Sequence, residues 1–164
     1  MTDCSRDTLL FSRLGPKAVV ADFRGGRLTT DAGALLLREL GRRLGLFEAL
    51  DRAIPDPRWA PLVVHDQVTM LTQRITAIAL GYEDLNDHQT LRADPALQLA
   101  AGQVPDEGRT LASPPTLCRL ENRVDRTALV RVAEVLVDQF VAAHAEPPEA
   151  LILDFDATDD PVHG

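Results

Sequence analysis

The stretch Glu149–Gly164 reads EALILDFDATDDPVHG and has no counterpart elsewhere in the chain. A short apolar run over residues 150–153 leads directly into a cluster of four carboxylates: Asp154, Asp156, Asp159 and Asp160. Charged side chains are not desolvated at the end of a buried strand unless a cation or a partner compensates them. The pattern therefore predicts a strand over residues 150–156 whose end binds a cation or a partner.

Two of these carboxylates are expected to act together. Because side chains alternate between the faces of a strand, Asp154 and Asp156 share one face and Phe155 points to the other. The two-residue rise separates the carboxylates by about 7 Å along the strand, which suits one side of a Mg²⁺ site. The alternative is a strand that has emerged into solvent, where the acids are solvated or cap a turn.

The composition indicates one globular domain without a membrane segment. The 164 residues are 45% apolar and 26% charged, which is enough to bury a core. No apolar run approaches the roughly 20 residues of a membrane helix, and the N-terminus lacks the apolar core of a signal peptide. Two cysteines, Cys4 and Cys118, are too few for a disulfide scaffold or a zinc cluster. We therefore expect a cytoplasmic protein with reduced thiols and no membrane partner.

The excess negative charge is confined to the last fifth of the chain. The net charge is −8, and residues 132–164 hold eight acids but no Lys or Arg, so the acids and bases of residues 1–131 balance. An acidic balance argues against nucleic-acid binding through bulk electrostatics alone. A local concentration of carboxylates instead suits a site for divalent cations.

The predicted fold class is α+β, mainly helical with a few short strands. Residues 1–16 lack periodicity and are predicted to be a loose lead-in. Residues 17–148 are predicted to be mainly helical with an early β-hairpin, in which residues 17–23 turn and pair with residues 28–30. Residues 149–164 form a third region, the acidic strand described above.

Helices are predicted over residues 34–44, 46–52, 66–80, 96–101, 113–123 and 126–144. Apolar residues at three- and four-residue steps are expected to face the core in three of them: Leu36, Leu37, Leu40 and Leu44; Val64, Val68, Leu71, Ile75 and Ile78; Leu129, Val132, Ala133, Leu136 and Phe140. Residues 103–115 are rich in Pro and Gly and are predicted to be a linker.

Polar side chains of the helical region are expected to have structural roles, with one exception. The helix predicted over residues 113–123 could present Thr116, Arg119 and Arg123 to a phosphate backbone. A solvated helix face explains these residues equally well. Structural roles as caps, salt bridges or surface groups are predicted for the others: Glu83, Asp84, Asp87 and His88 as a turn cluster, Arg92 and Asp94 as a charge pair and cap, and His65 and His144 at the surface.

The acidic motif resembles a known catalytic motif. Residues 153–164, LDFDATDDPVHG, look like the first catalytic motif of DDE insertion-sequence transposases of the group numbered 1380. Three other stretches resemble that group in the same order: LTTDAG at 28–33; Arg74 with GYED at 81–84, then DH, LR and DP up to residue 95; and residues 111–122. The resemblance therefore covers nearly the whole chain from about Ala18.

This resemblance implies a DNA-transposing active site in a ribonuclease-H-like fold. In that family a carboxylate on the first strand, a second Asp and a Glu bind two Mg²⁺ ions that promote in-line phosphoryl transfer. Carried onto this sequence, Asp156 is the leading catalytic carboxylate and metal ligand, and Asp154 is the second. Transposon-end DNA with terminal inverted repeats is the implied partner, and a homodimer is an option.

The chain departs from the family pattern because it stops at Gly164, where family members continue. The second Asp and the Glu of the catalytic core are not recognised in it. We therefore expect the N-terminal part of a transposase, truncated after its first catalytic motif, with residues 149–164 as the first strand of an incomplete core.

Two other interpretations start from the same residues. The sequence Asp154-Phe155-Asp156-Ala157-Thr158 also matches the DxDxT motif of haloacid-dehalogenase-type phosphatases, with Asp154 as nucleophile, Asp156 as general acid/base and Mg²⁺ as cofactor. That motif usually lies near the start of its domain, whereas here a long helical region precedes it. The third interpretation is a non-catalytic remnant that binds DNA ends or dimerises.

We predict that this chain alone does not cut or join DNA, because only part of the metal-binding carboxylate set is recognised in it. Incubation with plasmid DNA and Mg²⁺, followed by gel electrophoresis, should show no cleavage above the level of a heat-denatured sample. Mg²⁺-dependent cutting that disappears in Asp156→Ala would contradict the prediction.

Overall fold

The structure is a computed structural model that describes residues 8–22, 29–105 and 108–154. Its elements in chain order are β1 (Thr8–Leu14), β2 (Lys17–Asp22), α1 (Ala34–Leu44), α2 (Leu46–Ala53), the 3₁₀ turn η1 (Ala60–Leu62), α3 (Gln67–Ala79), the 3₁₀ turn η2 (Leu85–Asp87), α4 (His88–Leu91), α5 (Pro95–Ala100), α6 (Pro114–Asn122) and α7 (Arg126–Ala142). The predicted class, mainly helical with a few short strands, is confirmed. The division into three sequence regions stays a prediction.

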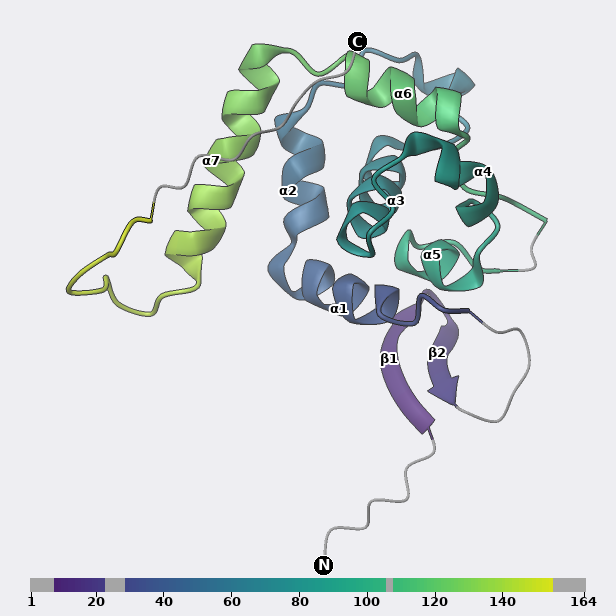
Figure 1. Ribbon diagram of the computed structural model, residues 1–164, viewed down its shortest axis with the longest axis horizontal. Coiled ribbons are helices and arrows are strands. Elements are labelled where there is room, and N and C mark those ends of the chain that lie inside the picture. Colours follow the sequence, from purple (N-terminus) through teal and green to yellow (C-terminus); the bar gives the residue numbers. More distant parts are fainter. Residues whose placement is uncertain (1–7, 23–28, 106–107, 155–164) are drawn as a thin grey trace, which may run out of the picture.

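Helix α3 is the central element, and the other helices are arranged around it (Figure 1). Helices α1, α2, α5 and α6 all contact α3, while α7 packs against α2 on one side of the molecule. The hairpin of β1 and β2 packs against α1. Carboxylate caps begin three of the helices, because Asp66, Asp94 and Asp125 each accept a hydrogen bond from the backbone N–H three residues later.

The β-hairpin forms from a different pair of segments than predicted. β1 pairs antiparallel with β2, with Leu10 opposite Val20 and Leu14 opposite Lys17. The prediction of a loose lead-in is therefore wrong over residues 8–14, and the partner of β2 precedes it in the chain. Gly15 adopts a left-handed backbone conformation (φ 55°), which glycine permits at no steric cost and which closes the two-residue turn.

Helix α1 buries the face opposite to the predicted leucine stripe. Its buried residues are Ala34, Leu35, Arg38 and Gly41, whereas Leu36 is 67% exposed and Leu40 and Leu44 are also exposed. The reason is close packing: a Cβ at Gly41 would overlap the ring of Phe47, so only glycine lets α2 fold back here. Arg38 donates to the backbone carbonyl of Ser12 at 2.8 Å and thereby holds the hairpin against α1.

Helix α3 is buried on more sides than an amphipathic stripe predicts. Leu71 is buried as expected, but Val64 and Ile78 are exposed, and Gln73 and Thr76 are fully buried in their place. Because α1, α2, α5 and α6 all contact α3, neighbouring helices also cover some of its polar side chains. A buried polar side chain is stabilised by a hydrogen-bond partner inside the protein. Gln73 has such partners, whereas the Thr76 hydroxyl has none among the described residues.

Gln73 finds its partners across the core. Its Nε2 donates to the carbonyl of Ala112 at 3.0 Å, and the Ala112 N–H donates to its Oε1 at 3.0 Å. The same Nε2 lies 3.0 Å from Nδ1 of His88. Leu111 and Ala112 are fully buried, so the linker predicted over residues 103–115 contains a core segment. We call this arrangement the Gln73 clamp.

The strand predicted over residues 150–156 is absent from its described part. Residues 150–154 carry no regular secondary structure and are exposed, with Ile152 at 96%. A strand is stable only beside a partner strand, and within the described residues the only pairing is that of β1 with β2. Residues 155–164, including Asp156, lie outside the described residues.

Loss of the Gln73 clamp should destabilise the fold. Gln73→Leu has similar volume but leaves the N–H and carbonyl of Ala112 buried without partners, which costs about 2 kcal/mol or more. The matched control is Gln139→Leu, which removes a hydrogen bond to the Leu44 carbonyl near the surface of α7. Urea denaturation measures both variants. A Gln73→Leu change no larger than that of the control would contradict the clamp.

Candidate functional site

The acidic segment is accessible in its described part. Asp154 is exposed and follows the exposed apolar residues Leu151, Ile152 and Leu153. Its partner carboxylate, Asp156, lies outside the described residues. A carboxylate is the ligand that Mg²⁺ prefers, so Asp154 fits the chemistry of a divalent cation, but the pairing of the two acids stays a prediction. In the described part of the chain, no three His, Cys, Asp or Glu side chains are grouped to hold a metal.

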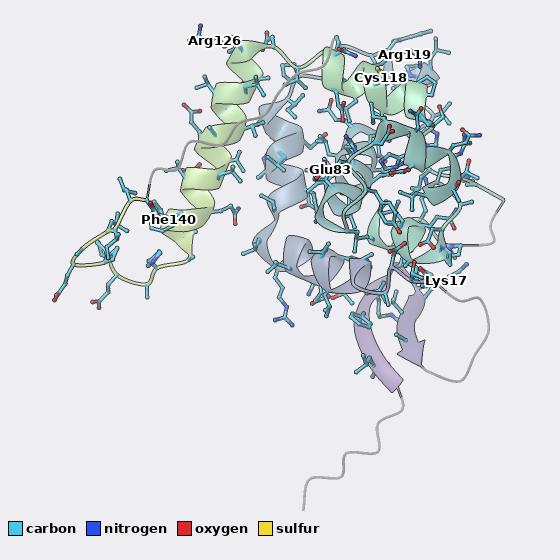
Figure 2. The ribbon with its side chains drawn as sticks, in the orientation of Figure 1. Lys17, Glu83, Cys118, Arg119, Arg126 and Phe140 are labelled. Carbon is cyan, nitrogen blue, oxygen red and sulfur yellow. The ribbon has the colours of Figure 1, made fainter. Side chains whose placement is uncertain are left out.

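Helix α6 carries the three side chains predicted to contact DNA, and they have different surroundings. Arg119 is exposed on the outer surface of α6 (Figure 2). Thr116 is half-buried, with its hydroxyl 3.0 Å from that of Ser113 at the start of the helix. Arg123, at the end of the helix, is bonded within the chain. Of the two arginines, Arg119 is therefore the one whose guanidinium is exposed to solvent.

Arg123 belongs to a network of ion pairs and hydrogen bonds that holds the loop after α2 against the start of α3. Its guanidinium lies 3.2 Å from the carboxylate of Asp56 and also bonds the side chain of Gln67 at the start of α3. Arg58 binds the same carboxylate at 2.6 Å and donates to the His65 carbonyl at 2.8 Å. The hydrogen bond from Arg58 lowers the pKa of Asp56 to about 2, and burial lowers the pKa of Arg123. These contacts give Arg123 a structural role beside any role in DNA binding.

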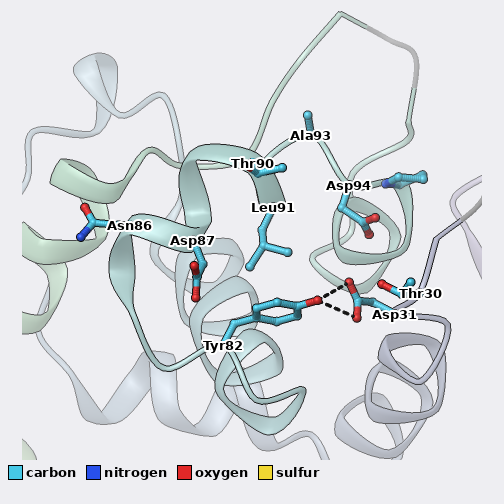
Figure 3. Close-up of a pocket in the computed structure, with 10 residues that line it drawn as sticks. Thr30, Asp31, Tyr82, Asn86, Asp87, Thr90, Leu91, Ala93 and Asp94 are labelled. Atoms are coloured by element: carbon cyan, nitrogen blue, oxygen red, sulfur yellow. Dashed lines mark hydrogen bonds between the residues drawn. The ribbon is translucent and has the colours of Figure 1, made fainter.

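Two stretches of the resemblance meet in one pocket (Figure 3). The pocket has a volume of about 620 Å³ and is lined by Thr30 and Asp31 from before α1, and by residues between α3 and α5 that include Tyr82, Asp87 and Asp94. The Tyr82 hydroxyl lies 3.2 Å from both carboxylate oxygens of Asp31. The Thr29 hydroxyl donates to Asp94 at 3.0 Å. Residues 51 and 65 positions apart are thereby joined at the N-terminal side of α1.

The chemistry of this pocket favours hydrogen-bond donors over anions. Asp31, Asp87 and Asp94 supply three carboxylates, which repel a phosphate. The observed contacts are internal, so the pocket residues tie the start of α1 to the segment between α3 and α5. Sequence reasoning named these residues only as parts of separate motifs. Nothing in their spacing indicated that they converge.

The polar cluster after α3 is structural where the structure describes its contacts. His88 is fully buried and bonded to Gln73, and Asp84 caps η2 by accepting from the Asn86 N–H at 2.8 Å. The predicted pairing of Arg92 with Asp94 differs: Arg92 donates to the Thr110 hydroxyl, while Asp94 caps α5.

His65 and His144, which were both expected at the surface, differ from each other. His144 is exposed, as predicted, although its ring packs against Phe140 with centroids 4.6 Å apart. His65 is only half-exposed, and burial lowers its pKa. Its backbone carbonyl accepts from Arg58, so the neighbouring loop partly covers a residue that was expected at the surface.

A comparison with protein-family models matches Transposase DDE domain, group 1, over residues 11–164. The chain belongs to the DDE transposase family. Comparisons with curated proteins and with solved structures give no match. The family match spans both the helical region and the acidic segment.

Membership of the DDE transposase family carries two general consequences. DDE transposase domains act on DNA, and they generally use divalent metal ions. The haloacid-dehalogenase interpretation is not favoured by this match. In addition, none of the helices that the structure describes has the length and apolar character needed to cross a membrane.

The burial of His88 should make stability depend on pH. Burial lowers the pKa of His88 to about 4, from an ordinary value of 6.5. Between these values the unfolded chain binds a proton that the folded chain does not, so stability is fully present above pH 6.5 and falls as the pH drops toward 4. The expected loss is on the order of 3 kcal/mol. The pH range of this loss, from 6.5 to about 4, lies above the pKa of Asp56, which is about 2.

Urea denaturation at a series of pH values measures this loss. His88→Gln keeps a hydrogen-bond acceptor for Gln73 and should flatten the dependence between pH 6.5 and 4. The matched control, His144→Gln at the exposed end of α7, should follow the wild type. An equal slope in wild type and His88→Gln would show that His88 titrates as it does in the unfolded chain.

Proposed function

We propose that this chain acts in DNA transposition as part of an insertion-sequence transposase of the group numbered 1380. The observation that carries the proposal is the family match over residues 11–164, and it is supported by four stretches that resemble motifs of that group in the same order. The acidic motif belongs to the catalytic part, and the helical region of residues 17–148 binds and positions the DNA ends.

The catalytic carboxylates in this proposal are Asp156 and Asp154. Both follow an apolar run, and the described member of the pair, Asp154, is exposed. These side chains would hold Mg²⁺ through their oxygens. When bound, the ions would activate water or a 3′-hydroxyl and stabilise the charge of the phosphoryl transition state.

The DNA partner is the end of a transposon, with its terminal inverted repeats. Arg119 is the leading phosphate contact because it is exposed on α6, with Thr116 and Arg123 beside it on the same helix. Arginine suits phosphate because its planar guanidinium donates two parallel hydrogen bonds. The overall charge of −8 means that binding relies on local arginines rather than on a broad basic surface.

Binding to terminal-repeat DNA tests the proposal. Fluorescence anisotropy or gel shifts at several salt concentrations should show binding to the repeat, and Arg119→Ala should reduce the salt dependence by about one released counterion. Arg52→Ala, an exposed arginine at the end of α2, is the matched control and should leave the slope unchanged.

Two results would contradict the DNA-binding role. One is equal affinity for the terminal repeat and for a scrambled duplex of the same composition. The other is an Arg119→Ala salt slope equal to that of the wild type and of Arg52→Ala. The first outcome removes the recognition of the transposon end, and the second removes α6 as the contact surface.

A further inference from the structure

An acidic residue lies on the helix that is proposed to contact DNA. Glu121 is exposed on α6, two residues after Arg119. Because a carboxylate repels the phosphate groups of DNA, the charge of Glu121 opposes DNA binding at this helix. Its contacts in the structure indicate a role that outweighs this repulsion.

Glu121 forms an ion pair with Arg74 of the central helix α3. The Nε atom of Arg74 lies 2.5 Å from the Glu121 carboxylate, and the side chain of Arg74 is only 13% exposed. Arg74 also donates to the backbone carbonyls of Tyr82 at 3.2 Å and Glu83 at 2.7 Å. These contacts fix the planar guanidinium in one orientation, so Arg74 is a rigid anchor for the carboxylate of Glu121.

A second ion pair holds the other side of α6. Arg123, at the end of the helix, lies 3.2 Å from the Asp56 carboxylate in the loop after α2. Glu121 and Arg123 are about 160° apart around the helix axis, at about 100° per residue. The buried residues Leu117 and Leu120 lie between them, on the side that faces the core. Because α6 is attached on both sides of its buried face, its rotation about its own axis is restricted.

The rotation of α6 decides the direction of Arg119. Arg119 is exposed and lies about 160° around the helix from the buried Leu117. Its guanidinium makes no hydrogen bond to another residue within the part of the chain that the structure describes, so the helix backbone sets its direction. Because a hydrogen bond weakens steeply away from its preferred angle, a rotation of α6 would weaken the contact of Arg119 with a phosphate.

We propose that Glu121 is a positioning residue for the DNA contact of α6. Its ion pair with Arg74, together with the ion pair on the other side of the helix, fixes the rotation of α6. The fixed helix directs Arg119 toward the phosphate backbone of DNA. This inference rests on the proposed role of α6 in DNA binding. It gives Glu121 an effect on DNA affinity opposite to the effect of its charge alone.

The sign of the change in DNA affinity gives the first test. Glu121→Ala removes the ion pair and one negative charge. Charge alone predicts tighter binding, whereas the positioning role predicts that the affinity for the terminal-repeat duplex falls about threefold to tenfold. The matched control is Glu83→Ala, because Glu83 is exposed and only its backbone carbonyl bonds Arg74. It should bind DNA as tightly as the wild type, or more tightly. Fluorescence anisotropy at one low salt concentration measures the affinities, and circular dichroism confirms that each variant is folded.

A double substitution shows whether Glu121 acts through Arg119. In an Arg119→Ala background the direction of the Arg119 side chain no longer matters, so Glu121→Ala should not weaken DNA binding further. Its effect in that background should equal that of Glu83→Ala. A residue that contributes only to the stability of the fold would leave the DNA affinity of the folded protein unchanged in both backgrounds.

Three outcomes would overturn the proposal. Binding by Glu121→Ala as tight as that by Glu83→Ala shows that only the charge of Glu121 matters. Equal weakening by Glu121→Ala with and without Arg119 shows that Glu121 acts through another group. In both cases Arg119→Ala alone still weakens binding, so the proposed role of α6 stands. If Arg119→Ala alone leaves DNA binding unchanged, the proposed role of α6 fails, and the positioning role fails with it.

Discussion

The hydrogen bonds of the Gln73 side chain are the interaction on which the rest of the helical region depends. Gln73 lies in the central helix α3 with no exposed surface, and it bonds both backbone groups of Ala112 and the ring of His88. A buried amide without partners costs free energy, whereas a fully bonded one specifies a single packing arrangement. The clamp fixes the segment that leads into α6, and α6 leads directly into α7. The position of Arg119 therefore follows from a contact made between residues far apart in the sequence.

Local signals predicted the helices well, and tertiary contacts decided what the sequence pattern could not. Asp94 was predicted as a helix cap, and in the structure Asp66, Asp94 and Asp125 each cap the following helix with their own side chain. The exposed leucine stripe of α1 was not predictable, because it depends on the approach of Phe47 to Gly41. The same holds for β1, whose pairing depends on the turn at Gly15 rather than on a periodic pattern. Burial of polar groups such as Gln73 also conflicts with any prediction that assigns only apolar residues to the core.

For the candidate site, too, sequence motifs predicted one part, and the rest depends on contacts between distant residues. The acidic motif and its order among the other motifs indicated the DDE transposase family, and the family match agrees. The geometry of Asp154 and Asp156 could not be derived, because a strand takes its shape from neighbours and the described residues supply none beside residues 150–154. The pocket that joins Asp31 to Tyr82 was likewise invisible in the sequence, since it requires the fold to bring two distant stretches together. Arg123 shows a further effect of folding, because the contact with Asp56 gives a candidate DNA ligand a structural partner.

The hydrogen exchange rate of the Ala112 backbone amide tests the central role of the clamp most directly. This N–H donates to Gln73 Oε1 in a segment that sequence patterns describe as a linker. The account predicts that native-state exchange, followed by NMR, occurs at Ala112 only through global unfolding, with the same free energy as the slowest amides of α3. Exchange of the Ala112 amide as fast as that of an exposed loop residue would contradict it.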